Sequence, residues 1–268
     1  MNQSRSRQTQ AAVAIFWGAI FVAVILRLYL VMLPPEIALM RWGTDDMFYY
    51  SQIAGHLAHS GFLSFDGITP ASGVQPLFTL MLWPFGAWVL DDFAASVFVI
   101  FVMISMLHIA TGFALRYVIL SLGGAALFAS FAVAIFLLHP KIISMSFQGT
   151  EASLAFLLLT STLWAWHGVQ EGRVSTLSAS AVFAGLVLTR LDFALFLLGL
   201  ALWSLLTRSL RMTEVLALLP LPLLALMGWC GFIWYQTGSA LPDSGVAKTF
   251  LLTALFAELN IGGVMPAR

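Results

Sequence analysis

The chain has 268 residues, of which 60% are hydrophobic and only 9% are charged, and its mean hydropathy is +0.95. This composition excludes a soluble globular protein. Twelve Lys and Arg residues balance twelve Asp and Glu residues, so the chain has no basic surface for a nucleic-acid backbone, and nucleic acid is excluded as a partner. The single cysteine, Cys230, excludes a disulfide framework and a cysteine-ligated metal. The class of protein that fits this composition is a polytopic membrane protein.

The first apolar run, 11–33, follows a polar head that carries Arg5 and Arg7. A helix needs about 20 apolar residues to cross the hydrocarbon core of a bilayer, so this run is long enough for one crossing. It has no small-residue cleavage site of the kind that ends a signal peptide. We therefore predict a retained first span and a cytoplasmic tail over residues 1–10.

A large outer loop, 34–92, begins at Pro34-Pro35 and contains the acidic pair Asp45 and Asp46. Thr44 is a good N-cap for a helix over about 45–60 that Gly61 stops. Apolar residues, with Tyr50 among them, would line one face of this helix, which predicts an amphipathic helix lying at the membrane interface. Two acids in a first turn also stabilise the helix dipole, so capping explains the pair without any catalytic role.

Seven further apolar runs lie at 76–90, 93–115, 118–138, 152–167, 176–207, 214–235 and 250–257. The run at 176–207 would make about 48 Å of helix, which is too long for one crossing. Thr189-Arg190-Leu191-Asp192 interrupts it, and we predict two spans that meet there.

The run at 76–90 is short and contains Trp83-Pro84, so we predict a re-entrant or interfacial helix rather than a span. The positive-inside rule favours this topology, because six basic residues then lie inside and four lie outside. The inner six are Arg5, Arg7, Arg116, Arg173, Arg208 and Arg211, and the outer four are Arg41, Lys141, Arg190 and Lys248. The predicted fold is thus an all-α polytopic membrane protein with about seven transmembrane helices.

Acidic residues gather on the outer side in this topology, and they are Asp45, Asp46, Asp66, Asp91, Asp92, Glu151, Asp192 and Asp243. In so charge-poor a chain, carboxylates from separate connections at one face indicate a site. Solvation of ordinary loop residues explains Asp66, Asp91 and Asp92 equally well. Arg27 is a charged residue well inside the first predicted span. We expect its side chain to extend to the membrane interface rather than to face the other helices of the bundle.

Four groups of residues, in chain order, resemble motifs of the GT-C fold glycosyltransferases, which are polytopic enzymes that use polyprenyl-phosphate sugars. The first group lies in the outer loop and reads TDDMFYY (44–50), GFLSFDG (61–67) and SGVQPLF (72–78). The others are Gly149-Thr150-Glu151, then Thr189-Arg190-Leu191-Asp192, then YQTGSALP (235–242) followed by Lys248. The resemblance covers about residues 11–250.

This resemblance implies a GT-C-like core over 11–250, followed by a short C-terminal segment, 251–268. It also implies transfer of a sugar from a polyprenyl-phosphate donor to a hydroxyl of a glycan, lipid or protein acceptor, outside a bacterial inner (plasma) membrane. Asp45 would be the general base, with Asp46 as the fallback. The other residues that the resemblance places at the substrates are Glu151, Asp192 and Gln75 for sugar or acceptor, and Arg190 and Lys248 for the phosphate.

No cofactor is expected, and a divalent metal stays open. The turn that contains Gln75 departs from the family pattern, and family members usually continue with more spans than this chain has. A non-catalytic or truncated GT-C-like membrane subunit, which would need a partner chain, is therefore kept as an alternative. A transporter is disfavoured, because the predicted spans are nearly free of charge.

Overall fold

The computed structural model describes residues 2–239. The predictions for Asp243, Lys248 and the segment 251–268 fall outside the described residues. In the described part the chain is helical and contains no strand, apart from one isolated bridge between Ser64 and Pro70. The predicted all-α architecture is confirmed for this part of the chain.

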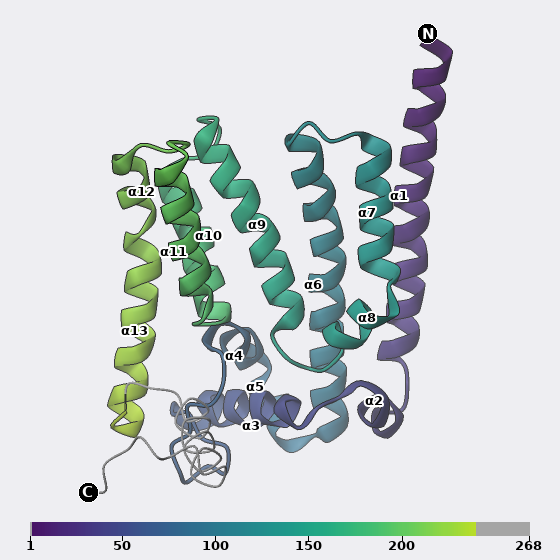
Figure 1. Ribbon diagram of the computed structural model, residues 1–268. Coiled ribbons are helices and arrows are strands. Elements are labelled where there is room, and N and C mark those ends of the chain that lie inside the picture. The colour runs from purple at the N-terminus through teal and green to yellow at the C-terminus, as the bar shows by residue number, and fades with distance from the viewer. Residues whose placement is uncertain (1, 240–268) are drawn as a thin grey trace, which may run out of the picture.

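One set of helices runs side by side and forms a bundle (Figure 1). They are α1 (Asn2–Val31), α6 (Phe93–Ser121), α7 (Ala126–Leu138), α9 (Ala152–Gln170), α10 (Thr176–Thr189), α11 (Phe193–Leu206), and α12 (Met212–Leu218) continued by α13 (Pro220–Thr237). The other helices named here lie across one end of this bundle, and we call them the platform. The platform comprises α2 (Pro35–Trp42), α3 (Asp45–Ser60), α4 (Pro76–Leu82), the 3-10 turn η1 (Trp83–Phe85) and α5 (Gly86–Asp91).

Several helices are long and apolar enough to cross a membrane. By length and composition, α1, α6, α9 and the α12–α13 pair qualify, and α7 with α8 (Pro140–Ser146) would make a fifth span bent by 58°. The predicted seven spans are not confirmed. Helices α10 and α11 have 14 residues each, which gives about 21 Å of helix against a hydrocarbon core of about 30 Å. The predicted break of the run at 176–207 is correct, because α10 ends at Thr189 and α11 begins at Phe193.

The segment 76–90 is not among the candidate spans, because it forms α4, η1 and α5, which pack on α3 (Figure 1). Two glycines allow this close packing. A Cβ at Gly86 would collide with Ala58, and one at Gly55 would lie 2.7 Å from the Cβ of Leu90. The packing buries Ala54 and Gly55 of α3, so it holds α3 against α4 and α5.

Helix α3 has the predicted bounds, Asp45–Ser60, and ends at Gly61, whose φ of 75° is in the left-handed region. Thr44 occupies the N-cap position with an extended backbone, but its side chain makes no capping hydrogen bond. The hydroxyl instead donates to the carbonyl oxygen of Gln148 across 2.9 Å. A local capping role for the Thr44 side chain was the wrong prediction, because a carbonyl from a distant turn is within its reach.

Arg27 is buried, with 2% of its surface exposed, so the preferred prediction of snorkelling is wrong. Its guanidinium donates to the carbonyl oxygen of Leu137 at 2.8 Å and to Nδ1 of His108 at 3.1 Å. Leu137 lies in the last turn of α7, where carbonyls lack helical N–H partners, and the nearby Pro140 has no N–H to donate. Arg27 therefore supplies a donor that the broken helix lacks, and it ties α1 to α6 and α7.

Candidate functional site

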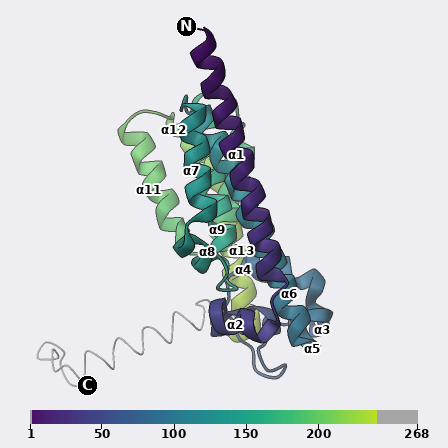
Figure 2. The same cartoon turned by 90° about the vertical axis from the view of Figure 1, so that its right-hand side faces the viewer.

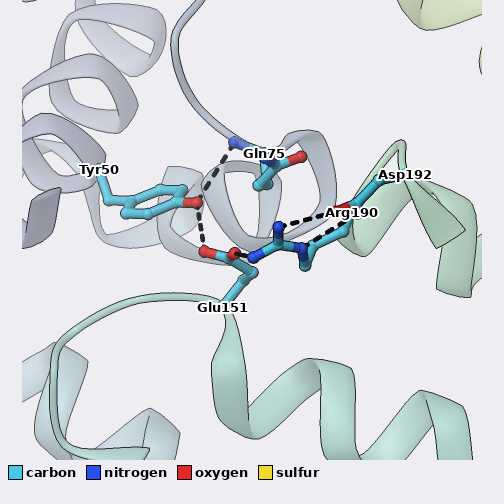
Figure 3. Close-up of polar contacts among 5 residues, drawn as sticks. All are labelled: Tyr50, Gln75, Glu151, Arg190 and Asp192. Atoms are coloured by element: carbon cyan, nitrogen blue, oxygen red, sulfur yellow. Dashed lines mark hydrogen bonds and ion pairs between the residues drawn. The ribbon is translucent and has the colours of Figure 1, made fainter. Parts of the chain in front are cut away.

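A hydrogen bond joins the platform to the bundle at the start of α9. The phenol of Tyr50, on α3, donates to Oε2 of Glu151 across 2.6 Å (Figure 3). Glu151 is only 8% exposed. Burial and the neighbouring carboxylate of Glu151 raise the pKa of Tyr50, because both disfavour a phenolate. The phenol of Tyr50 is therefore protonated and donates this hydrogen bond, and Oε2 of Glu151 accepts it.

Arg190 and Asp192, between α10 and α11, complete the network. Arg190 donates through one terminal nitrogen to Oε1 of Glu151 at 3.1 Å. Through Nε and its other terminal nitrogen it donates to both carboxylate oxygens of Asp192, at 3.1 and 2.9 Å. This two-point pairing sets the plane of the guanidinium. Three of the five N–H donors of Arg190 are used in this way, and two remain without a partner among the described residues.

Gln75 joins the same network through its backbone. Its N–H donates to the phenol oxygen of Tyr50 at 3.4 Å (Figure 3), and Pro76 starts α4 directly after it. The structure thus brings together Gln75, Glu151, Arg190 and Asp192, four residues from three separate segments that the motif resemblance had singled out. Lys248 lies outside the described residues, so its position relative to the network stays a prediction.

The turn before α9 is held against the start of α3. Gly149 has a φ of 80°, and a Cβ there would lie 2.5 Å from Cγ of Met47. Only glycine fits such a backbone at such a close approach. Together with the Thr44 hydroxyl on Gln148, this packing fixes Glu151 opposite Tyr50. The motif Gly149-Thr150-Glu151 thereby has a physical explanation, namely a tight turn that delivers a carboxylate.

Asp45 and Asp46 lie in the exposed first turn of α3. Oδ1 of Asp45 accepts the N–H of Asp46 at 3.1 Å. Asp46 precedes Tyr50 by one helical turn, and its charge contributes to the raised pKa of Tyr50. Asp46 is therefore close to the network, whereas Asp45 is turned away from it by about 100° around the helix.

The network has more negative than positive charge. Arg190 faces two carboxylates, those of Glu151 and Asp192, and Asp45 and Asp46 add two more in the neighbouring helix turn. Such a site suits hydroxyl-rich or cationic groups better than a free anion. No group of three His, Cys, Asp or Glu residues that fits a metal ion occurs in residues 2–239.

Two residues of this region were missed from the sequence as functional positions. Tyr50 was assigned to the apolar face of α3, although its place one turn after Asp46 was a usable signal. Gln236, at the end of α13, was noted only as part of a motif. Its amide oxygen accepts the N–H of Leu63 at 2.7 Å, and its amide nitrogen donates to the carbonyl oxygen of Gly61 at 3.4 Å. Gln236 therefore fastens α13 to the loop that follows α3.

Comparisons with protein family models, with curated proteins and with solved structures find no match to this chain. The fold and the site define an all-α, multi-pass membrane protein with a hydrogen-bonded polar network where the platform meets the bundle.

Proposed function

We propose that this protein is a membrane glycosyltransferase that moves a sugar from a polyprenyl-phosphate donor to an acceptor hydroxyl. One observation carries the proposal. Segments far apart in the chain, which contain Tyr50, Gln75, Glu151 and Arg190, converge in one network beside the acidic first turn of α3. These are the segments that resemble GT-C enzymes. Their convergence supports a common site.

The reaction needs a proton acceptor. The acceptor oxygen bonds to the anomeric carbon, the bond between that carbon and the phosphate oxygen breaks, and the hydroxyl proton passes to a carboxylate. Asp45 and Asp46 are exposed, so either carboxylate could receive this proton from an acceptor bound at the network. The resemblance favours Asp45 as the base, while the position of Asp46 beside Tyr50 favours Asp46. Attack opposite the leaving phosphate inverts the sugar.

The other network residues would orient the substrates. Both oxygens of Glu151 already accept hydrogen bonds, so we assign it the positioning of Tyr50 and Arg190. The two remaining N–H groups of Arg190 would contact sugar hydroxyls or a phosphate oxygen. We assign the main compensation of the phosphate charge to Lys248, since two carboxylates already surround Arg190. In this proposal the platform faces outward from a bacterial plasma membrane.

The test uses purified protein in lipid nanodiscs with a panel of polyprenyl-phosphate sugars, and it measures released polyprenyl phosphate. We expect turnover in the wild type and a loss of about 10²–10⁴-fold in Asp45→Asn or Asp46→Asn, depending on which carboxylate is the base. Asp91→Asn is the control, because Asp91 is an exposed platform carboxylate at the end of α5. Equal turnover in all four proteins contradicts the proposal, and no turnover in the wild type favours the non-catalytic subunit.

A further inference from the structure

A cavity of about 330 Å³ lies between α10, α11, α12 and α13. Its walls are aliphatic and aromatic, and they include Phe183, Val187, Leu197, Val215 and Pro222. No residue of the network lines it. The cavity therefore needs its own explanation, independent of the proposed function.

The polar atoms at the cavity are already paired. The indole nitrogen of Trp166 donates to the hydroxyl oxygen of Ser204 at 2.8 Å, and that hydroxyl donates to the carbonyl oxygen of Leu200 at 2.7 Å. A buried water needs two to four polar partners. The cavity offers no such set among the described residues, so its chemistry selects hydrocarbon rather than water or a polar ligand.

The cavity reaches the lipid-facing surface of the protein. In the turned view of Figure 2, α11 lies along one side of the bundle. Leu195 and Leu198 of α11 line the cavity and are also 73% and 55% exposed. In a membrane, the material around this exposed apolar helix is lipid hydrocarbon. The atoms that line an empty cavity lack van der Waals partners. Entry of a neighbouring lipid acyl chain would supply these contacts and is therefore favourable.

We propose that this cavity binds one fatty acyl chain of a bilayer phospholipid. A water molecule occupies about 30 Å³ in the liquid, and a methylene group is of similar size. The cavity therefore has room for roughly ten methylene groups. That matches much of one acyl chain, whereas a polyprenyl chain is several times larger. The ligand is therefore an ordinary membrane lipid, and the site is separate from that of the proposed sugar donor.

The experiment places the full chain in nanodiscs that contain a phosphatidylethanolamine with a photoreactive diazirine in one acyl chain. After illumination, mass spectrometry of peptides locates the labelled residues. We expect labelling of the buried cavity-lining residues, Phe183 and Val187 on α10 and Pro222 on α13, which ordinary surface contact with lipid does not reach. Ala201→Phe should reduce this labelling several-fold, because Ala201 lines the cavity and the larger ring fills it.

Leu202→Phe is the matched control, since Leu202 is the next residue and is 52% exposed on α11. It should leave the labelling of α10 and α13 unchanged. Ala201→Leu is a milder filling variant, and the melting temperature of each variant checks its fold. Undiminished labelling in folded Ala201→Phe and Ala201→Leu overturns the proposal. So does displacement of the probe by an equimolar polyprenyl phosphate, which would assign the cavity to the sugar donor.

Discussion

The phenol of Tyr50 lies 2.6 Å from Oε2 of Glu151, although the two residues are 101 positions apart in the chain. The contact links the surface helix α3 to the first turn of a bundle helix, α9. It also leaves Glu151 free to hold Arg190 through its other oxygen. The geometry of the whole network therefore depends on this pair.

Removal of the Tyr50 hydroxyl in Tyr50→Phe should destabilise the protein by about 1.5–3 kcal/mol, since a hydrogen bond to a buried carboxylate is lost. Thermal unfolding in detergent measures the loss. Tyr49→Phe is the control, because Tyr49 is 46% exposed. The raised pKa of Tyr50 means that its contribution is present below the usual tyrosine pKa of about 10 and falls as the pH rises past it. Equal stability of both variants at pH 7 would contradict the importance of this contact.

Substitution of Arg190 leaves Glu151 buried with one fewer donor. We expect Arg190→Gln to cost about 1–3 kcal/mol in unfolding free energy, a value reduced by the partial exposure of Arg190. Arg173→Gln is a matched control at the opposite end of the bundle, where the side chains of Arg173 and Glu171 are each 45% exposed. That exposed pair should contribute about 0–1 kcal/mol. A control variant as unstable as Arg190→Gln would show that burial of Glu151 is irrelevant.

Arg27 is expected to contribute to stability rather than to orientation in the membrane. Arg27→Met keeps much of the side-chain volume but leaves the Leu137 carbonyl and His108 Nδ1 without their donor. The expected cost is about 1–3 kcal/mol for each buried group left unsatisfied. Chemical denaturation in mixed micelles measures it. Arg41→Met, at the exposed end of α2, should change the stability little. Wild-type stability of Arg27→Met would mean that water replaces the guanidinium.

Asp66 organises the outer loop in a pH-dependent way. Its carboxylate accepts from the backbone N–H groups of Ile68 and Thr69, at 2.8 and 2.7 Å. These hydrogen bonds hold the pKa of Asp66 well below its usual value. Because the folded-state pKa is depressed, the stabilisation is present above the unfolded pKa of about 3.9 and is lost as the pH falls below it. Amide hydrogen exchange over residues 64–70 should therefore lose protection in acid. Asp66→Asn should remove this pH dependence, and Asp91→Asn should retain it.

The platform should lie on one side of the membrane. In a Cys230→Ser background, cysteines at Gly73 and Asp91 should react with an impermeant thiol reagent from the same side. A cysteine at the exposed Leu122, between α6 and α7, should react from the other side. Gly73 is a suitable site, because nothing lies within 4 Å of a Cβ there. Opposite accessibility of Gly73 and Asp91 would show that α4 and α5 cross the membrane.

Local features of the amino-acid sequence determined much of the secondary structure. Helix α3 has the predicted bounds, because amphipathic spacing and the left-handed Gly61 act within a few residues, although the Thr44 hydroxyl does not cap the helix. The break at Arg190 and Asp192 and the interruption near Pro84 were likewise visible, since charge and proline disfavour a continuous span wherever they occur. Composition alone indicated a multi-pass membrane protein, because a soluble protein of this length could not bury so large a fraction of apolar residues in its core.

The tertiary structure alone decided where polar side chains point. The periodicity of α3 put Tyr50 on its buried face, but a buried phenol needs an acceptor, and only the packing of α9 shows that Glu151 provides it. Arg27 had two physically acceptable positions along α1, outward to the interface or inward to the bundle. The end of α7, with a carbonyl that lacks a helical donor, holds it inward. Such choices depend on contacts across many tens of residues, and no local pattern in the chain records them.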